Sequence, residues 1–172
     1  MCSWGWKKKD EDEPKDHALG RSRGGFTTKI HLLADGNGHP LGFHLTGGQV
    51  HDSTVVDEVL MTANDLTDGA GDPVAWPVCL AGDKGYRAAW IDEYLLQLGI
   101  TPVIPSKENE DRSARPIEFS PDQYRNRNII ERLIGWLKEY RRVFARFEKS
   151  AKNFAGMIRI AFTQRYMRVL FG

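Results

Sequence analysis

Residues 77–104, PVCLAGDKGYRAAWIDEYLLQLGITPVI, indicate the class of fold that this chain adopts. The short apolar run Pro77–Ala81 is typical of a buried strand. Residues Arg87–Leu98 carry apolar side chains at helical spacing and are followed by Gly99, a common helix stop. Thr101–Ile104 is a second short apolar run. A strand, a helix and a strand in this order predict a βαβ unit and therefore an α/β fold.

The segments upstream of this unit predict an antiparallel hairpin and a further helix. Thr27–Ala34 and Pro40–Thr46 are strand-like, and residues 35–39 between them read DGNGH. The Asp-Gly and Asn-Gly steps of this linker are strong hairpin signals. Asp52-Ser53-Thr54 offers N-cap residues for a helix over the apolar run Val55–Met61. Together with the βαβ unit, these elements predict a mixed sheet with helices on its faces.

The C-terminal third predicts two long helices, one from Asp122 to about Phe147 and one from about Asn153 to Leu170. At about 100° per residue, the first helix places four polar residues within a stripe about 60° wide. They are Tyr124, Arg127, Glu131 and Lys138. The opposite stripe holds Leu133, Leu137, Tyr140 and Phe144. One face can therefore pack on the sheet while the other presents a carboxylate flanked by cations, although solvated helix faces often show the same pattern.

The composition describes a globular chain of about one domain. Its 172 residues are 41% apolar and 27% charged, which excludes collagen-like, low-complexity and disordered chains. No apolar run approaches the roughly 20 residues that a membrane-spanning helix needs, and the N-terminus is charged where a signal peptide is hydrophobic. Cys2 and Cys79 lie far apart, which argues against a disulfide framework or a zinc knuckle. We expect a cytoplasmic protein with no membrane partner.

The charge is divided unevenly along the chain. Residues 1–120 contain 12 Lys and Arg against 19 Asp and Glu, a net charge of −7. Residues 121–172 contain 12 Lys and Arg against 4 Asp and Glu, a net charge of +8. The C-terminal third is therefore the part suited to a polyanion such as nucleic acid. The alternative is that these side chains only form a solvated surface.

Asp83 is a candidate functional residue because it directly follows the predicted strand Pro77–Ala81. Glycines at positions 82 and 85 let a ligand or another backbone segment come close to it. In open α/β sheets, ligands bind beyond the carboxyl ends of the strands, where Asp83 is expected to lie. The alternative is that Asp83 only shapes a Gly-Asp-Lys-Gly turn.

Four separated blocks of the sequence resemble one known family. Tyr124, Arg127, Glu131 and Lys138 match, at every spacing, the YREK signature of bacterial insertion-sequence transposases of the DDE class. GRSRGGFTTKIH at residues 20–31, GQVHD at 48–52 and GDKGY at 82–86 are similar to further blocks of the insertion-sequence-four/five group. The resemblance covers about residues 15–172 and keeps the order of the blocks.

The resemblance implies a ribonuclease-H-like mixed sheet flanked by helices, with three metal-binding carboxylates. Asp83 matches the second of these carboxylates, and Glu131 matches the third. Both are then catalytic metal ligands, for Mg²⁺ or alternatively Mn²⁺, which favour oxygen donors. Tyr124, Arg127 and Lys138 become DNA-binding residues, and the partner is DNA at the ends and target sites of a mobile element.

The first carboxylate of the family has no counterpart in this sequence. The family places it on a first strand upstream of the block at residues 20–31, whereas residues 1–6 read MCSWGW and the acidic residues near positions 10–16 lie in a polar run. We therefore expect a flexible arm over residues 1–25 and a truncated catalytic domain over residues 26–172 that lacks its first strand. Such a chain would be one half of a split transposase or a degenerate copy.

These observations lead to three hypotheses about function. The first is a metal-dependent DNA transposase, of which this chain alone is expected to show little or no activity because one carboxylate is missing. Besides DNA, the partners considered are a second copy of this chain in a homodimer or an upstream transposase half. The second is a non-catalytic DNA-binding or regulatory remnant, which the basic C-terminal third favours. The third is the product of a decayed gene, because a sheet without its first strand exposes an edge and part of its core.

Overall fold

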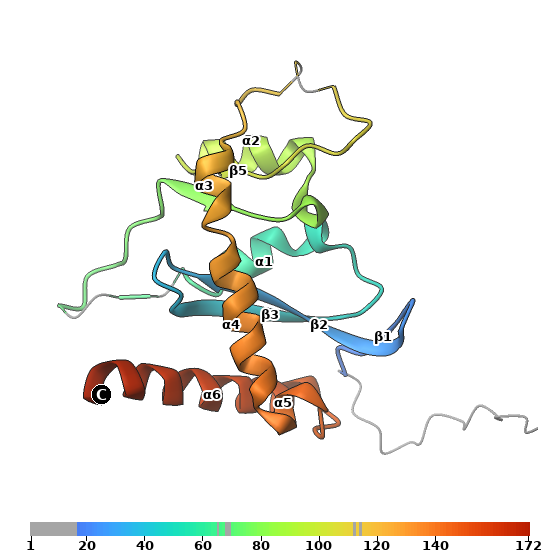
Figure 1. Ribbon diagram of the computed structural model, residues 1–172, viewed down its shortest axis with the longest axis vertical. Coiled ribbons are helices and arrows are strands. Elements are labelled where there is room, and N and C mark those ends of the chain that lie inside the picture. The colour runs from blue at the N-terminus through green and yellow to red at the C-terminus, as the bar shows by residue number, and fades with distance from the viewer. Residues whose placement is uncertain (1–16, 65, 68–69, 112, 114) are drawn as a thin grey trace, which may run out of the picture.

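The computed structural model of the chain describes residues 17–64, 66–67, 70–111, 113 and 115–172, and Figure 1 shows its elements. The strands are β1 (Gly20–Ser22), β2 (Gly25–Ala34), β3 (Pro40–Gly47), β4 (Cys79–Ala81) and β5 (Thr101–Val103). The α-helices are α1 (Val56–Met61), α2 (Ala89–Gln97), α3 (Pro121–Arg125), α4 (Asn128–Glu139), α5 (Arg141–Phe144) and α6 (Ala151–Phe171). The short 3₁₀ helices η1 (Asp52–Val55) and η2 (Lys84–Tyr86) precede α1 and α2. The predicted α/β class is confirmed.

The predicted hairpin forms from β2 and β3, which pair antiparallel from Thr28 with Gly47 to Ala34 with Pro40. The carboxylate of Asp35 closes the turn, because its Oδ1 accepts hydrogen bonds from the backbone N–H groups of Asn37 and His39, at 2.9 and 2.8 Å. β1 adds a short antiparallel pairing at the start of β2. β1 lies within the predicted flexible arm, while residues 1–16 of that arm lie outside the described residues.

The βαβ unit also forms, since β4 and β5 pair in parallel on either side of α2. The prediction of one mixed sheet is wrong for the described part of the chain. There the strands form two sheets, β1-β2-β3 and β4-β5. β4 spans only Cys79–Ala81, which pair with Thr101–Val103, so the predicted strand over Pro77–Ala81 begins two residues late.

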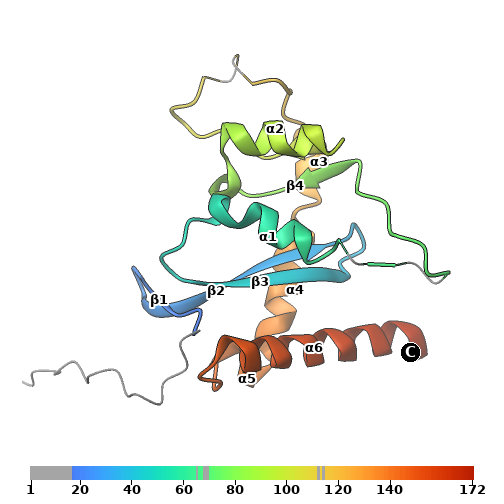
Figure 2. The ribbon, with the colours of Figure 1, turned by 180° about the vertical axis from the view of Figure 1, so that it is seen from behind.

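Helices α1 and α4 lie on opposite sides of the region between the two sheets. α4 crosses in front of the β2-β3 hairpin in Figure 1, and α1 is in front when the molecule is turned around in Figure 2. α6 runs along the hairpin on the side away from β4 and β5. The hairpin and the βαβ unit are therefore joined by helices on both faces.

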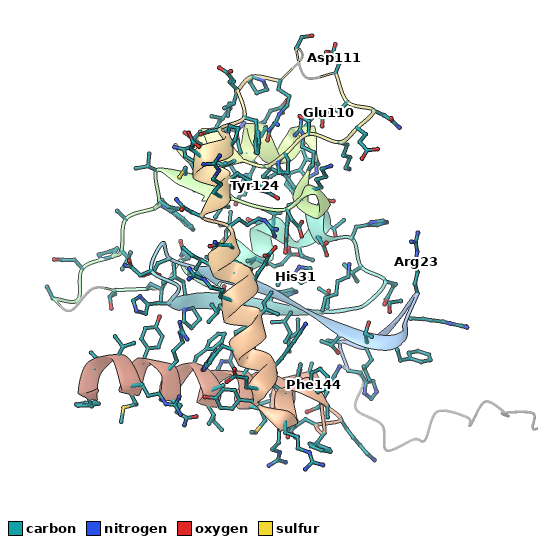
Figure 3. All side chains as sticks on the ribbon, in the orientation of Figure 1. Arg23, His31, Glu110, Asp111, Tyr124 and Phe144 are labelled. Carbon is teal, nitrogen blue, oxygen red and sulfur yellow. The ribbon has the colours of Figure 1, made fainter. Side chains whose placement is uncertain are left out.

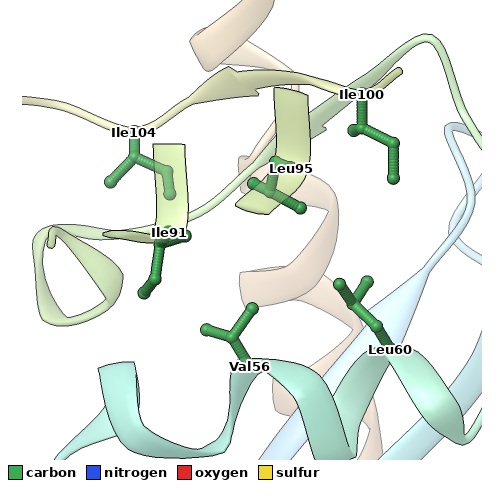
Figure 4. Packing of buried hydrophobic residues seen from close by; sticks show 6 residues of the cluster. All are labelled: Val56, Leu60, Ile91, Leu95, Ile100 and Ile104. Carbon is green, nitrogen blue, oxygen red and sulfur yellow. The ribbon is translucent and has the colours of Figure 1, made fainter. Parts of the chain in front are cut away.

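Two clusters of buried apolar side chains stabilise the fold. The first joins α1, α2 and the residues on either side of β5, and it consists of Val56, Leu60, Ile91, Leu95, Ile100 and Ile104 (Figure 4). The second joins α4, α5 and α6 and consists of Leu137, Val143, Phe154, Ile158, Ala161 and Phe162. Apolar side chains of β2 and β3 pack against the second cluster. Burying one such side chain contributes about 1.5–3 kcal/mol, so these clusters set the positions of the elements around the site.

The prediction of one continuous helix from Asp122 to about Phe147 is wrong. It divides into α3, α4 and α5, with breaks around Asn126 and at Tyr140, where ψ is 102°. The hydroxyl of Tyr140 donates a hydrogen bond to Oε1 of Gln164 on α6, at 2.7 Å, and its ring packs against Trp136. Because of the break at Tyr140, Phe144 does not lie on the same face as Leu133 and Leu137, and it is 70% exposed.

The predicted helix over Asn153–Leu170 forms as α6, which begins two residues earlier. Ser150 caps this helix, because its hydroxyl accepts a hydrogen bond from the backbone N–H of Asn153. Every helix in the described part of the chain is too short or too polar to cross a membrane.

Candidate functional site

A cavity of about 330 Å³ lies between the two sheets, and we call it the inter-sheet cavity. Its walls include residues 29–33 of β2 and residues 80–83 at the end of β4. Helix α1 contributes Val56, Val59 and Leu60, while α4 and the residue before it contribute Arg127, Ile130, Glu131 and Ile134. Most of the wall is aliphatic, and charged side chains from four separate segments lie along it.

Asp83 lies where β4 ends, as its position in the sequence predicted. Its Oδ1 accepts a hydrogen bond of 2.8 Å from the backbone N–H of Gly85, which fixes the turn into η2. The residue is exposed and lines the inter-sheet cavity. Asp83 therefore both shapes the turn and lines the cavity. Its role in the turn is compatible with a role in binding or catalysis.

A second carboxylate, that of Asp52, lies beside the same turn. A Cβ added to Gly85 would be 2.4 Å from Oδ2 of Asp52 and 2.9 Å from Oδ1 of Asp83. Real Cβ atoms do not come this close to other atoms, so a side chain at position 85 would displace these carboxylates from their present positions. Lys29 neutralises part of this charge, because its Nζ donates hydrogen bonds to Oδ1 of Asp52 at 2.9 Å and to the carbonyl of Val50 at 2.7 Å.

Glu131 lies on α4, on the other side of the inter-sheet cavity. Arg127 precedes it by one helical turn and donates a hydrogen bond from Nη2 to Oε1 of Glu131. The guanidinium of Arg127 also lies over the ring of Tyr124, 5.3 Å from its centroid. The side chain of Glu131 is 59% exposed, so solvent and ions can reach its carboxylate.

The predicted site residues are therefore only partly brought together. Asp83, Arg127 and Glu131 line the inter-sheet cavity, whereas Tyr124 and Lys138 do not. Tyr124 belongs to α3 and packs against Phe119, with ring centroids 5.3 Å apart. Lys138 is exposed near the far end of α4, about two helical turns beyond Glu131. The four residues of the predicted stripe thus lie on α3, on α4 and in the two-residue link between these helices.

A buried histidine forms the floor of the site next to the two aspartates. His31 of β2 is 3% exposed, and Figure 3 shows it on the hairpin beside α4. Its Nδ1 and Nε2 form hydrogen bonds with the hydroxyls of Tyr86 and Thr46, both at 2.8 Å. Burial lowers the pKa of His31 below its usual value of 6.5, and nearby Lys29 and His44 act in the same direction.

Burial also raises the pKa of the Tyr86 hydroxyl, with the charges of Asp52 and Asp83 as further causes. Tyr86 therefore stays protonated and can donate to the imidazole of His31. A neutral imidazole has one donor and one acceptor nitrogen, so it can join the two hydroxyls into one hydrogen-bonded chain. This chain fixes η2, and with it the turn that carries Asp83, against β2.

The carboxylates agree in chemistry with a divalent cation but do not form a complete ligand set. Mg²⁺ and Mn²⁺ prefer oxygen donors, and the carboxylates of Asp52, Asp83 and Glu131 all line the inter-sheet cavity. Among the described residues, no group of three or more His, Cys, Asp or Glu side chains is close enough to hold a metal ion. The donors present therefore fit a hard cation in kind.

Sequence reasoning did not assign a role to Asp52, Lys29, His31 or Tyr86. The sequence predicts only an N-cap role for Asp52, whereas the cap position of η1 is His51. The available signal was that all four lie within the blocks at residues 20–31, 48–52 and 82–86. Their proximity depends on the approach of β2 to η2, which no local pattern in the sequence encodes.

The fold and the site define an α/β domain in which acidic side chains and neighbouring cations line a cavity between two sheets. The family model described as the transposase DDE domain matches residues 3–164, and the chain belongs to this family. The predicted membership among bacterial insertion-sequence transposases is thereby confirmed, while the subgroup and the YREK signature stay predictions. No solved structure matches the chain.

Two relatives carry names that agree with this family. The chain is 31% identical over 148 residues to a Burkholderia cepacia protein named "Putative transposase for insertion sequence element IS402". That match covers 86% of this chain and 63% of the relative, so the chain spans less than two thirds of the relative's length. A Brucella ovis protein named "Putative transposase for insertion sequence element IS6501" is 28% identical over 144 residues, a match that covers 83% of this chain and 100% of the relative.

Proposed function

We propose that the chain is the catalytic part of a DNA transposase that cuts and joins DNA at the ends of an insertion sequence. The observation that carries this proposal is that Asp83 and Glu131, which come from distant segments, line the same cavity. Membership in the DDE family and the names of the two relatives support the same function. The substrate class is double-stranded DNA, since the family acts on mobile DNA elements.

Asp83 and Glu131 are the proposed catalytic residues and metal ligands, and Mg²⁺ is the proposed ion, with Mn²⁺ as a substitute. A divalent ion bound there would stabilise the negative charge that develops on phosphate oxygens during phosphodiester cleavage. Arg127 is suited to a forked contact with a phosphate, because its guanidinium already lies between Tyr124 and Glu131. Lys138, further along α4, would contact a phosphate of the flanking duplex as a point charge.

Tyr124 is proposed to contact DNA through its ring. The residue is half-buried, and Arg127 and Phe119 hold the ring from two sides. A ring held in this way can stack on an unpaired base at a cleaved end without losing much conformational freedom. The contacts with Arg127 and Phe119 would also hold the ring if its role were only to pack the junction of α3 and α4.

Mn²⁺ binding and DNA nicking together test the proposal. In a titration followed by the electron spin resonance of free Mn²⁺, Asp83→Asn and Glu131→Gln should each weaken binding about ten-fold or more. Glu139→Gln is the matched control, because Glu139 is an exposed carboxylate on the same helix but outside the cavity. Unchanged Mn²⁺ binding in both variants would refute the assignment of the two ligands.

The nicking assay uses a supercoiled plasmid that carries the element ends, with Mg²⁺ or Mn²⁺ present. We expect little cleavage by the chain alone, because the described residues do not form a complete ligand set for a metal ion. Any cleavage that is seen should disappear in Asp83→Asn and in Glu131→Gln. Full cleavage by both variants would show that the chemistry occurs elsewhere.

A second candidate function is a non-catalytic DNA-binding or regulatory role toward an intact transposase. The net charge of +8 in residues 121–172 favours it, as does the exposure of Lys138 and Arg141 around the end of α4. This role requires DNA binding but no metal ligand. Binding of duplex DNA that is unaffected by Asp83→Asn and Glu131→Gln, together with unchanged Mn²⁺ binding, would favour it over the first function.

A further inference from the structure

Two segments that are distant in the sequence meet at the end of the molecule away from the C-terminus of α6. They are the hairpin of β1 and β2 and the loop after α5, which lie on the same side in Figures 1 and 2. Arg146 of this loop connects them, because its guanidinium donates a hydrogen bond to Oγ1 of Thr28. It also donates to the carbonyls of His17 and Ala18, just before β1. The hairpin and the loop therefore hold each other in place.

The backbone of this junction adopts unusual conformations. Arg146 has a φ of 42°, and Ala18, to whose carbonyl it donates, has a φ of 43°. Among the described residues, these two are the only ones other than glycine with a positive φ. Such residues are uncommon, and they persist where the surrounding contacts hold them, often at functional sites. The surface around Arg146 is therefore a candidate for a binding role.

The turn after β3 holds the hairpin from its other face. The N–H of Gly48 donates a hydrogen bond of 2.9 Å to the carbonyl of Thr27. A Cβ added to Gly48 would be 2.1 Å from Oγ1 of Thr27, so the turn covers the face opposite to the Thr28 side chain. A Cβ added to Gly20 would be 1.2 Å from Oε1 of Gln49, which packs directly on β1. Contacts on both faces thus fix a hairpin that would be marginally stable alone.

Three phenylalanine side chains around this junction are exposed. Phe147 follows Arg146 directly and is 57% exposed, and Phe144 on α5 is also exposed (Figure 3). Phe26 lies two residues before Thr28, so its side chain is on the same face of β2, and it is 66% exposed. Among the described residues, none of these three rings pairs with another ring or lies under a guanidinium. Their faces are open to a flat ligand.

The surroundings of these rings carry positive charge. Arg21 is the cross-strand partner of Phe26, and Arg23 lies at the tip of the hairpin in Figure 3. Both arginines are exposed, and so is Lys149 in the loop after α5. Residues 17–29 contain three Lys and Arg and no Asp or Glu. The hairpin therefore presents cations beside an exposed ring.

The other segment adds cations and little negative charge. Residues 141–152 contain five Lys and Arg against one acidic residue, Glu148. The side chain of Glu148 is only 9% exposed, and its Oε1 forms an ion pair of 3.1 Å with Nη2 of Arg142. A polyanion is therefore a better partner for this surface than an apolar or basic protein.

The combination of open rings and cations suits a nucleic acid whose bases are unpaired. Aromatic side chains stack on the flat faces of such bases, while cations contact the phosphates. A duplex would use the cations but not the rings, because its base faces are already stacked. β2 also links this surface to the inter-sheet cavity, since Lys29 lines the cavity and lies three residues, or about 10 Å, beyond Phe26.

We propose that this surface, which we call the junction surface, binds single-stranded DNA. The rings stack on unpaired bases, and the cations contact phosphates; the residues are Arg21, Arg23, Phe26, Phe144, Phe147 and Lys149. The choice of DNA, and the position of its unpaired strand next to the cleavage site, rest on the proposed function. The stacking on unpaired bases does not.

Fluorescence anisotropy of the full chain with a labelled oligothymidine of about 12 nucleotides tests the junction surface. The double variant Phe26→Ala with Phe147→Ala should weaken binding about ten-fold or more, because two stacking contacts are lost. Binding of a duplex of the same length should change about two-fold or less. The matched control is Phe171→Ala near the end of α6, another exposed phenylalanine, which should leave both affinities unchanged.

Single substitutions at position 147 separate stacking from general apolar contact. Phe147→Trp should bind the oligothymidine at least as tightly as wild type, because indole has a larger face. Phe147→Leu keeps an apolar side chain but loses the ring, so it should bind about three-fold more weakly or worse. Thermal melts of all variants verify folding, which is expected because the substituted rings lie outside both apolar clusters.

The contribution of the cations is measured through the salt dependence of binding. For single strands, each phosphate contact contributes roughly 0.7 to the slope of the logarithm of the binding constant against that of salt. Arg21→Ala with Arg23→Ala should therefore lower the slope by about 1.4. An oligothymidine that carries 5-iodouracil should form photo-cross-links to at least one of the three rings, as identified by mass spectrometry. Cross-links found only elsewhere in the chain would contradict the proposed position.

The outcomes distinguish this inference from the proposed function, because the assay contains neither metal ions nor element ends. Unchanged affinity of the Phe26 and Phe147 double variant for the oligothymidine would overturn the junction surface and leave the nicking experiment unaffected. Equal weakening of duplex binding, or tight binding by Phe147→Leu, would overturn it too. Loss of self-association in sedimentation with unchanged binding of the oligothymidine would assign the rings to a contact with a second copy instead.

Discussion

His31 connects the hydrogen bonds of the site to the stability of the fold. The imidazole is buried between the hydroxyls of Tyr86 and Thr46, and burial holds its pKa below 6.5. Asp52 and Asp83 act in the opposite direction without overcoming the effect of burial. The folded chain therefore binds a proton at this position less readily than the unfolded chain does.

This difference predicts a loss of stability in mild acid. As the pH falls from about 7.5 to about 5.5, the unfolded chain takes up a proton on His31 before the folded chain does, so the free energy of unfolding decreases. His31→Gln should remove this part of the pH dependence, as measured by urea unfolding at several pH values. The control is His51→Gln, because His51 is exposed. Identical pH profiles for wild type and His31→Gln would contradict the prediction.

At the scale of single residues, the sequence was most informative where a functional residue sits at the end of a recognisable element. Asp83 could be placed because an apolar run precedes it, and Glu131 because the helical spacing aligns it with Arg127. The position of Asp52 beside Asp83 could not be predicted, since it depends on the packing of η1 against the turn around Gly85. Such contacts between distant segments are set by packing rather than by local pattern.

Among the elements, α2 is held to the loop that follows β5 by a buried ionic network. The carboxylate of Asp92 is 1% exposed and accepts hydrogen bonds from Nη1 of Arg87, at 2.8 Å, and from Nε of Arg115, at 3.2 Å. Arg87 also donates to Glu110, and this contact lowers the pKa of the Glu110 carboxyl. Arg115 donates in addition to the carbonyl of Ile104, the residue after β5.

Asp92→Ala should therefore be strongly destabilising. The substitution leaves the guanidinium groups of Arg87 and Arg115 buried without their common partner, a situation that costs about 3–5 kcal/mol. Denaturant unfolding of the variant measures this loss. Glu93→Ala, at the next position of α2 but exposed, should change the free energy of unfolding by about 0.5 kcal/mol or less. Comparable effects of the two substitutions would contradict the role of the network.

The order of the main elements could be predicted from hydrophobic spacing and turn signals. Strand β1, the division of the strands into two sheets and the division of the long helix into α3, α4 and α5 could not. The hairpin, the βαβ unit and α6 lie within a few residues of their predicted positions. The break at Tyr140 could not be anticipated, since the sequence there retains good helix formers. The contacts of Tyr140 with Gln164 and Trp136 override this local preference.

On the scale of the whole molecule, the basic residues of the C-terminal third are distributed over α4, α5 and α6. Lys138 and Arg141 are exposed on either side of the break between α4 and α5. A duplex that contacts Arg127 near the inter-sheet cavity could extend along α4 toward them. The overall charge of the chain, only +1, conceals this concentration of positive charge.

Binding to duplex DNA should therefore weaken steeply with salt, and part of the slope should depend on Lys138 and Arg141. For duplex DNA, the logarithm of the binding constant falls by roughly 0.9 per phosphate neutralised for each ten-fold rise in salt. The double variant Lys138→Ala with Arg141→Ala should lower the slope by about 1 to 2, as measured by fluorescence anisotropy. Lys107→Ala, in the loop after β5, should leave the slope unchanged. An affinity that does not vary with salt would exclude this surface.

A substitution at position 85 would disturb the acidic wall of the inter-sheet cavity. A Cβ there lies 2.4 Å from Oδ2 of Asp52 and 2.9 Å from Oδ1 of Asp83, so these carboxylates would have to turn away. The buried members of both apolar clusters lie outside residues 82–85. A chain with alanine at position 85 would therefore keep its core and yet present its acidic groups differently, which makes this glycine the place where the arrangement of the carboxylates can be varied separately from the stability of the fold.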